Sequence, residues 1–484
     1  MGLKLHEKID LISDPTVMSI IHAVRRCGSA NRTTIAEAAG VTITTVSRLL
    51  AVLLDKNVRA VREDPVSREI SIVGDFAYTL GVHAGASKLR ISVCDFALNN
   101  LNAKQLCDLG VELDVFDLAK SEIDRLTLDP NKVISVKYTN LKDPTQEIAR
   151  AIDRVIQGLL RSPVPLISIC ISTPAIVNYQ NDMFAFCPNI PSLNGKYARS
   201  LIYEEASKLA LEKGVLICFE HDTEAALVRQ RELLYKREAQ EDRREWGYDN
   251  IALVYQGSGT GAAFNLNRKL YRGRGGAAGE VGNLRAPWMR EKFRYDSEEF
   301  PLEPFSDEEN LLKKEIRDAV SRPLTIEEAI RSYVFNVRPG DLEGYLKKIG
   351  AIKTDENGKT YYALRDFKKD MPNRYELLLE YLLYVTNVLV DLLSMDIIIF
   401  GGPVFDRLGD GIIVDLARRK YEGTVQCLAR DANIIRSEVP PGEDMVAVGA
   451  ATVALYNCHA NNQVYVTYYS GQSRPVCIEW LGEN

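Results

Sequence analysis

Apolar residues near the start of the chain recur at helical spacing and predict three short helices. The first begins at Asp14 and Pro15, a capping side chain followed by proline at the first helical position. The second covers 34–39 and ends at Gly40, and the third covers about 42–56. Their buried stripes are predicted to be Val17, Ile20, Ile21 and Val24 in the first helix and Ile43, Val46, Leu50 and Leu53 in the third.

The polar residues of the third helix gather at its N-terminal end, and two strands are predicted after it, over 58–61 and 70–73. Two helices joined by a small-residue turn and followed by a strand pair are typical of a winged helix-turn-helix, whose second helix enters the major groove of DNA. A small helical bundle that contacts another protein is the alternative. The residues expected to contact DNA are Thr42, Thr44, Thr45, Ser47 and Arg48 on the helix, and Arg62 and Arg68 between the strands.

From residue 80 onward the pattern changes, because short apolar runs begin to alternate with amphipathic segments. This alternation indicates an α/β domain, which keeps its functional groups at the carboxyl ends of its strands. The predicted elements are a hairpin over 80–84 and 89–95, strands over 166–172, 215–219, 251–255 and 396–400, and helices over 145–160, 223–234 and 446–455.

Two glycine-rich segments and two acidic residues indicate where the chemistry lies. Gly257–Gly261 follows a predicted strand, and a second glycine cluster over 273–282 contains Glu280. Such turns let backbone N–H groups close around an anion or a sugar, and no Walker lysine follows that would indicate a P-loop NTPase. Asp222 comes directly after another predicted strand, where it serves as a ligand contact, as a helix cap, or as both.

Composition narrows the classes of protein to consider. A chain of 484 residues with 46% apolar and 26% charged residues is expected to form two or three soluble domains. The net charge of −6 argues against a uniformly basic nucleic-acid binder. Residues 1–75, however, hold ten Lys and Arg against nine Asp and Glu, a local balance that permits contact with DNA.

The cysteines and the apolar segments bear on where the protein works. Nine cysteines are dispersed singly, which is typical of free thiols in a reducing cytoplasm. The N-terminal residues lack the apolar core of a signal peptide. The most apolar predicted helix, over 381–393, is interrupted by polar residues, so we expect a cytoplasmic protein without a membrane span.

Several segments together resemble the ROK family of repressors, open reading frames and kinases. The resemblance extends over nearly all of 14–455 and implies an α/β actin-like, sugar-kinase two-lobe fold with an N-terminal winged helix-turn-helix domain. The implied domains are 1–76 for DNA binding, 77–219 plus 446–484 for the first lobe, and 220–445 for the second lobe. The matching segments are two phosphate loops at 80–88 and 257–261, a sugar-side loop at 187–191, a catalytic motif at 220–222, the family signature at 270–282 and an adenosine-side motif at 400–403.

Departures from the family pattern argue against catalysis. His83 stands where family kinases carry an aspartate that positions metal and phosphate, and an imidazole cannot replace a hard oxygen ligand of magnesium. Ala86 replaces a loop glycine, His221 the motif asparagine, and Asn283 the signature histidine. No cysteine occurs between 218 and 427, where the family's zinc-binding cluster would lie. We therefore expect an inactive kinase-like domain with no metal, no cofactor and no catalytic residue.

The resemblance implies a role for each remaining site residue. Asp222 stands at the position of the family's catalytic base and is expected here to accept hydrogen bonds from a sugar. The glycines at 401 and 402 serve either the vestigial nucleotide site or only a tight turn. The expected ligand contacts are Asn189, His221, Asp222, Glu280 and Asn283, and the vestigial nucleotide loops comprise Gly85, Ser87, Lys88, Gly257, Gly259, Thr260, Gly261, Gly401 and Gly402.

The function expected from these observations is transcriptional regulation of carbohydrate metabolism genes. A repressor would bind operator DNA as a homodimer or homotetramer, and a sugar or sugar phosphate in the kinase-like cleft would control it. Two alternatives stay open. One is an ATP-dependent sugar kinase with a fused DNA-binding module, and the other is a non-enzymatic scaffold whose helical N-terminus binds protein.

Overall fold

The computed structural model divides into two compact units. The first comprises 1–247, 274–276 and 438–484, and the second comprises 248–273 and 277–437. The residues that the structure describes are 3–86, 88–108, 134–178, 183–202, 204–240, 248–257, 259–285, 326, 330, 352–354, 360–362, 367–405, 410–420, 432–440, 443–457, 467–469 and 475–477.

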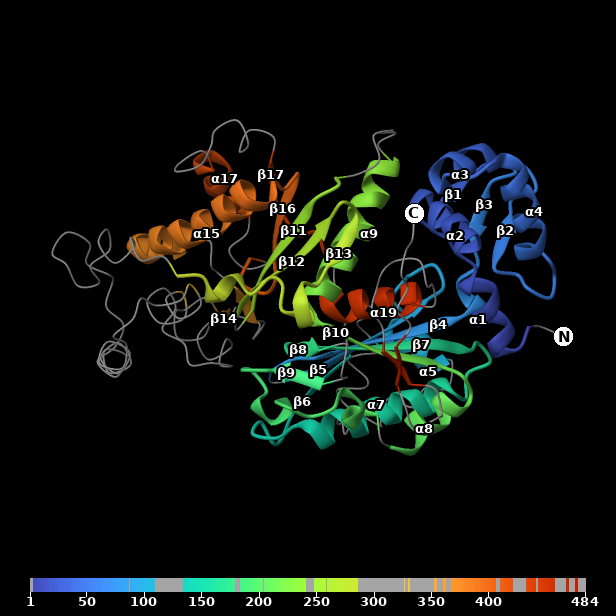
Figure 1. Ribbon diagram of the computed structural model, residues 1–484, viewed down its shortest axis with the longest axis horizontal. Helices are drawn as coiled ribbons and strands as arrows, with labels where there is room; N and C mark the ends of the chain where they lie inside the picture. The colour runs from blue at the N-terminus through green and yellow to red at the C-terminus, as the bar shows by residue number, and fades with distance from the viewer. Residues whose placement is uncertain are drawn as a thin grey trace. The chain divides into compact units, whose positions relative to one another are not determined.

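The N-terminal segment of the first unit forms four helices and a small sheet of order β1-β3-β2 (Figure 1). The Asp14 side chain caps the second helix by accepting hydrogen bonds from the backbone N–H groups of Thr16 and Val17, as predicted. The Asn31 side chain caps the third, which ends at Gly40 in the left-handed conformation. The elements are α1 (Leu5–Ser13), α2 (Pro15–Cys27), β1 (Ser29–Ala30), α3 (Arg32–Ala39), α4 (Ile43–Leu53), β2 (Val61–Glu63), β3 (Ile70–Ile72) and the 3-10 turn η1 (Gly74–Phe76).

Several details of this segment differ from the sequence-based expectation. Helix α1 and the two-residue strand β1 were not expected, and α4 ends at Leu53 rather than near Lys56. The first predicted strand, over 58–61, lies instead at 61–63, because a turn held by the Asp55 carbonyl occupies the preceding residues. The predicted helices and strands keep their order, and α1 and β1 are added to them.

The main sheet of the first unit has the strand order β10-β7-β4-β5-β6. Helices α9 and α19 pack against each other, and α19 also packs on β4, β7 and β5. Helices α7 and α8 lie on the other face (Figure 1). The bounds are β4 (Tyr78–Ala84), β5 (Lys88–Asp95), α5 (Ala103–Asp108), β6 (Ile134–Lys137), α7 (Thr145–Leu159), β7 (Leu166–Thr173), β8 (Ile176–Asn178), β9 (Met183–Phe186), η3 (Pro191–Leu193), η4 (Ala198–Leu201), α8 (Glu205–Glu212), β10 (Leu216–His221), α9 (Asp222–Gln240), η5 (Arg274–Gly276), α19 (Met445–Asn457), β18 (Thr467–Tyr469) and β19 (Pro475–Cys477).

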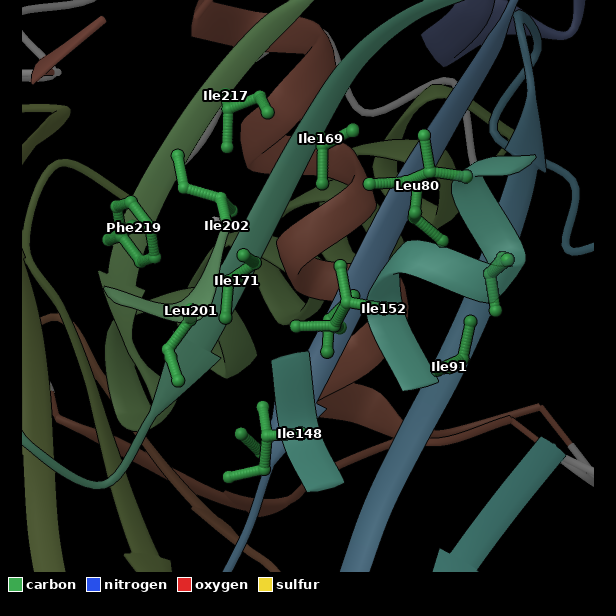
Figure 2. Close-up of a cluster of buried hydrophobic side chains, with 14 of the residues drawn as sticks. Leu80, Ile91, Ile148, Ile152, Ile169, Ile171, Leu201, Ile202, Ile217 and Phe219 are labelled. Carbon is green, nitrogen blue, oxygen red and sulfur yellow. The ribbon is translucent and has the colours of Figure 1, made fainter. Parts of the chain in front are cut away.

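The core between this sheet and α7 is mostly aliphatic. Figure 2 shows Ile148 and Ile152 of α7 facing Leu80 of β4 and Ile169 of β7, and all four side chains are fully buried. Burial of each such side chain contributes about 1.5–3 kcal/mol. On the opposite face, a Cβ atom at Gly81 would lie 1.9 Å from the Ala447 carbonyl oxygen, so only glycine lets α19 approach the strand this closely.

The second unit repeats a five-stranded sheet, in the order β13-β12-β11-β16-β17. Its core is formed with α15, a largely buried helix that contains the predicted helix over 381–393 and extends it toward its N-terminus. The bounds are β11 (Ile251–Gln256), β12 (Thr260–Leu266), β13 (Lys269–Tyr271), η6 (Val281–Asn283), β14 (Ile352–Thr354), β15 (Thr360–Tyr362), α14 (Phe367–Asp370), α15 (Pro372–Leu393), β16 (Ile397–Gly401), α17 (Asp410–Arg419) and β17 (Asn433–Arg436).

The unit boundaries differ from the predicted domain boundaries at 219/220 and 445/446. Residues 220–247 belong to the first unit rather than to the second lobe, and so do residues 438–445. The physical reason is that α9 packs on α19, and Gln230 of α9 exchanges hydrogen bonds with the Glu438 backbone.

Within the described ranges, no single helix is long and apolar enough to cross a membrane. Helices α3 and α4 reach the required length and hydropathy only when taken together, as a pair bent by 109°.

Candidate functional site

Two of the predicted ligand residues lie at the junction of β10 and α9. His221 ends the strand and Asp222 begins the helix, at the carboxyl edge that β10 shares with its parallel neighbour β7. The His221 Nδ1 and Asp222 Oδ1 atoms are 3.5 Å apart, and the Thr223 hydroxyl contacts both. The Asp222 carboxylate accepts this hydrogen bond from the Thr223 hydroxyl at 3.1 Å.

The loop that carries Asn189 lies within electrostatic reach of Asp222. Burial raises the pKa of the nearby Cys187 thiol to about 12, and the negative charge of Asp222 adds to this shift. The backbone N–H groups of Asn189 and Ile190 oppose it by donating to the same sulfur. Asn189, His221 and Asp222 thus all belong to the first unit, and the Cys187 thiol of the Asn189 loop is affected by the charge of Asp222.

Glu280 and Asn283 form a second pair, within the second unit. The Asn283 Nδ2 atom donates to Glu280 Oε2 at 3.1 Å. Their loop is fixed by Gly279, which has φ +88° and whose carbonyl accepts from the Ala262 N–H at 2.7 Å. A Cβ atom at Gly279 would lie 1.8 Å from the Ala262 carbonyl oxygen, so glycine is required here. The predicted ligand residues thus form two groups, one in each unit.

The glycine turn over 257–261 connects β11 to β12 and is organised by Gln256, a residue that the sequence analysis did not identify. The Gln256 side chain donates to the Gly259 carbonyl at 3.1 Å and accepts from the Thr260 hydroxyl at 2.7 Å. The sequence signal for Gln256 was an amide side chain at the end of an apolar predicted strand. Gly402 has φ +98° and packs so closely on Gln256 that a Cβ atom would lie 2.7 Å from its carbonyl oxygen. Gly401 ends β16, so this glycine pair forms a tight turn against β11.

The first predicted phosphate loop is the turn between β4 and β5. The Gly85 N–H donates to the Lys88 carbonyl at 3.1 Å, and Ser87 lies outside the described residues. Beside this turn, His83 Nδ1 lies 3.1 Å from Asp444 Oδ1 and 3.2 Å from Arg90 Nη1. Arg90 Nε lies 3.2 Å from the other Asp444 oxygen.

Asp444 is the buried centre of this charged group. Burial alone would raise its pKa, but the charges of His83 and Arg90 and the Ala447 N–H hold the pKa of Asp444 well below its usual range. Of these three residues, only His83 was singled out from the sequence. Because Asp444 is engaged by two basic side chains and also caps α19, the residues around His83 do not fit a magnesium–phosphate site.

The N-terminal turn of α4 presents short polar side chains to solvent. Thr42 caps the helix by accepting from the Thr45 N–H at 3.2 Å, and the two threonine hydroxyls are 2.9 Å apart. Thr44, Ser47 and Arg48 are exposed on the same helix. The structure therefore gathers all five residues predicted on this helix at its first two turns.

Ile43 corrects one expectation, because it was predicted to be buried and is 49% exposed. The buried stripe of α4 starts one turn later, at Val46, and continues through Leu50 and Leu53. The first turn of the helix therefore projects beyond the core. It adds an apolar side chain to the exposed polar face.

The β2–β3 hairpin carries the other two predicted residues. Arg62 is exposed and donates to the Ser71 hydroxyl at 3.0 Å. Arg68 has φ +62° and pairs with Glu63 at 2.9 Å, while Arg32 donates to the same carboxylate. The hydrogen bond from Arg32 holds the pKa of Glu63 below its usual range. Arg62 and Arg68 are thus held in place from opposite sides of the hairpin.

Comparisons with known proteins identify the fold. Residues 123–297 match the model of the ROK family, and no curated protein matches the chain. The chain is similar to the crystal structure of a ROK family transcriptional regulator, a homologue of the E. coli MLC protein, with TM-score 0.54, 14% identity, and coverage of 92% of this chain and 98% of that one. This likeness supports the expected actin-like, sugar-kinase fold.

Two sugar kinases are also similar at lower scores. One is a ROK hexokinase from Thermus thermophilus, with TM-score 0.43, 17% identity, and coverage of 78% of this chain and 98% of that one. The other is a ROK family glucokinase from Streptomyces griseus in complex with glucose and AMPPNP, with TM-score 0.45, 18% identity, and coverage of 78% and 99%. The segment in which the family's zinc-binding cysteines would fall, after residue 285, lies largely outside the described residues.

Proposed function

We propose that this chain, a member of the ROK family, is a DNA-binding repressor of carbohydrate metabolism genes that a sugar or sugar phosphate controls. The observation that carries the proposal is the exposed face of α4 beside the Arg-bearing β2–β3 hairpin. In this reading the N-terminal segment is a winged helix-turn-helix, with α4 as the recognition helix and the hairpin as the wing.

The α4 face supplies contacts suited to the major groove. Arg48 provides a planar donor pair for guanine, and Thr44 and Ser47 provide hydroxyls for base edges or phosphate. Exposed Ile43 provides an apolar contact for a thymine methyl group. Arg62 on the hairpin is exposed for phosphate contact. Because operators are read by symmetric proteins, the proposal includes a homodimer or homotetramer.

The effector part of the proposal rests on Asp222 and its neighbours. A carboxylate, an imidazole and an amide can together accept and donate hydrogen bonds to sugar hydroxyls. Within the second unit, the paired carboxylate and amide of Glu280 and Asn283 offer hydrogen-bonding groups of the same kind. The His83, Arg90 and Asp444 group argues against metal-assisted phosphoryl transfer, so we propose a non-enzymatic cytoplasmic regulator without a metal or cofactor.

DNA binding is tested with the duplex that the wild-type protein selects from a random-sequence library. Arg48→Ala should weaken binding to that duplex by about 1–3 kcal/mol, because one guanine contact is lost. Arg161→Ala, at an exposed position far along the chain, is the matched control and should leave affinity unchanged. The wild-type affinity should fall steeply with salt. Failure to select any duplex, or binding that does not depend on salt, would contradict the DNA-binding function and favour a protein-binding scaffold.

Effector binding is tested by thermal shift with D-glucose, D-mannose, D-galactose, N-acetyl-D-glucosamine and the 6-phosphate of each. A sugar that binds the native state at a hundred times its Kd should stabilise it by about 2.7 kcal/mol. Asp222→Asn should abolish this stabilisation, whereas Glu212→Gln, at an exposed position on α8, should preserve it.

The kinase alternative is tested by release of ADP from ATP with each of the same sugars. Asp222 favours this alternative, because a kinase needs a base near the sugar hydroxyl. Turnover on the order of 1 per second, within the usual range of enzymes, would overturn the proposal of an inactive domain.

A further inference from the structure

Helix α9 reaches from the candidate sugar site to the N-terminal helices. Asp222 is its first residue and Tyr235 lies in its fourth turn, about 20 Å further along at 1.5 Å per residue. Both ends lie in the first unit, and α9 contacts α2 and α19 there. One continuous helix therefore connects the residue proposed to bind sugar with the segment proposed to bind DNA.

The first half of α9 is packed too tightly to move independently of α19. A Cβ atom at Gly449 of α19 would lie 2.0 Å from the Ala225 carbonyl oxygen of α9, so the two helix backbones are in direct contact. One turn later, Arg229 forms two hydrogen bonds with Glu443, at 2.6 and 3.1 Å, and only 3% of Arg229 is exposed. A shift at Asp222 would therefore move α9 together with α19 rather than bend α9 locally.

The second half of α9 contacts α2 through stacked charged and aromatic groups. The Arg26 guanidinium of α2 lies 4.6 Å from the ring centre of Tyr235, which is 8% exposed. Tyr456 of α19 lies between the two helices, with its ring 4.4 Å from the His22 ring of α2 and 5.8 Å from the Arg231 guanidinium of α9. The two contacts of a guanidinium with a ring depend on the spacing of the helices, because a cation is attracted to a ring face within about 6 Å.

Helix α2 is in turn part of one packed body with the proposed DNA-binding helices. Arg25 of α2 is 3% exposed and donates to the Phe96 carbonyl at 2.8 Å, which anchors the helix to the end of β5. A single hydrophobic cluster joins Ile20 and Val24 of α2 to Ile35 of α3, Val46 and Leu50 of α4, and Val448 and Leu455 of α19. A displacement of α2 is therefore also a displacement of α4.

We propose that α9 transmits sugar binding at Asp222 to the DNA-binding helices, and that the stacked contact between Arg26 and Tyr235 is the connection. This inference rests on the proposed function. Sugar changes DNA affinity only if it binds one position of α9 more tightly than another. By linkage, DNA must change sugar affinity by the same factor.

The experiment measures the Kd for the selected duplex with and without whichever sugar of the eight-member panel raises the Tm of the wild-type protein. In the wild type the two values should differ by about tenfold, within the usual range of allosteric coupling. In Arg26→Gln the ratio of the duplex Kd with sugar to the duplex Kd without sugar should fall below about 2, because movement of α9 no longer displaces α2. Tyr235→Leu removes the same contact from the other helix and should give the same loss.

The control is Arg199→Gln, which removes a guanidinium that also lies 4.6 Å from a tyrosine ring, that of Tyr197, away from α2 and α9. It should keep the wild-type ratio. A purely structural role for Arg26 would lower the Tm or both affinities, whereas a coupling role leaves the sugar Kd and the sugar-free duplex Kd unchanged and alters only the ratio.

Each outcome is decisive. A ratio retained in Arg26→Gln and Tyr235→Leu overturns the inference while the proposed function stands. A wild-type ratio of 1 with sugar bound contradicts the sugar control in the proposed function, and the inference fails with it. If the wild-type protein selects no duplex, or no sugar of the panel raises its Tm, the proposed function itself fails.

Discussion

The two five-stranded sheets share one strand topology but differ in the chemistry of the corresponding turn. In each sheet a central strand, β4 or β11, pairs antiparallel with the next strand in the chain and parallel with a later one, β7 or β16. A further parallel strand and a further antiparallel strand then complete each sheet. The β4–β5 turn of the first unit therefore corresponds to the β11–β12 turn of the second.

Side chains hold these two turns in different ways. Beside the first turn, Asp444 binds the two basic side chains of His83 and Arg90. At the second turn, Gln256 binds the Gly259 carbonyl and the Thr260 hydroxyl without any formal charge. The shared topology fixes where the turns lie, whereas the side chains decide whether charge pairing or neutral hydrogen bonding stabilises them.

The largest expected effect comes from breaking the charged group of the first unit. Asp444→Ala leaves His83 and Arg90 without their shared carboxylate and removes the cap of α19. The free energy of unfolding should fall by about 3 kcal/mol, because an uncompensated buried charge is costly. Urea denaturation followed by circular dichroism measures this loss.

The corresponding change at the second turn is Thr260→Val, which removes one neutral hydrogen bond to Gln256. It should cost only about 1 kcal/mol. If Asp444→Ala and Thr260→Val lower the free energy of unfolding equally, charge pairing does not stabilise the first turn more than neutral hydrogen bonding stabilises the second.

An effect between those of Asp444→Ala and Thr260→Val is expected from the backbone contact that supports the second turn. Gly402→Ala combines a left-handed conformation, φ +98°, with a Cβ atom 2.7 Å from the Gln256 carbonyl oxygen. The free energy of unfolding should fall by about 2 kcal/mol. Gly411→Ala lies in helix α17, where the added Cβ atom would have no neighbouring atom within 4 Å. It should instead leave the free energy of unfolding unchanged or raise it by up to about 1 kcal/mol. If Gly402→Ala leaves the free energy of unfolding unchanged, β11 and the 401–402 turn can move apart at little cost.

Local patterns in the sequence predicted most of the strands and helices that build both sheets. The apolar runs over 166–172 and 251–255 correspond to β7 and β11 with ends shifted by one residue. The exposure of Ile43 could not be predicted this way. Its helical spacing matches the buried stripe, but only the folded structure shows that the first turn of α4 lies beyond the core.

The candidate site was predictable where its residues are close in sequence. The contact between His221 and Asp222, and that between Glu280 and Asn283, each lie within one short motif. The partner of His83 was not predictable, because Asp444 lies 361 residues away and reaches it only through the packing of α19 on β4. For the same reason, sequence placed the lobe boundary before α9, whereas long-range contacts place α9 with the first unit.

The charged group should also give the two turns different responses to acid. The folded pKa of Asp444 lies well below its ordinary value of 3.8, so its stabilising contribution is complete above that value and is lost as pH falls through the folded pKa. The stability difference between the wild type and Asp444→Asn should be constant from about pH 7 to about pH 5 and shrink below about pH 4. Urea denaturation across this range measures it. The difference for Thr260→Val should stay flat, and a parallel decline would show that Asp444 is not the titrating group.

The smallest expected effect concerns a charge of the first unit that is poorly compensated. Burial, and then the positive charge of Arg229, lowers the pKa of Lys236 on α9, although Glu232 and Glu443 oppose this and Arg25 adds to it. Because the folded pKa is below the ordinary value of 10.5, the protonated lysine costs stability at neutral pH, and this cost disappears as pH rises through 10.5. Lys236→Met should therefore raise the Tm at pH 7 by about 2 °C.

This gain should shrink when the Tm is measured at increasing pH, since the wild-type lysine then loses its charge. Lys213→Met, at an exposed position, is the control and should not raise the Tm. A fall in Tm for Lys236→Met would show that attraction to Glu232 and Glu443 exceeds the cost of burial. In that case the charge clusters around Asp444 and around Lys236 would both stabilise the first unit. Stabilisation by buried charge would then not be limited to the β4–β5 turn, whereas the β11–β12 turn of the second unit is held by neutral hydrogen bonds.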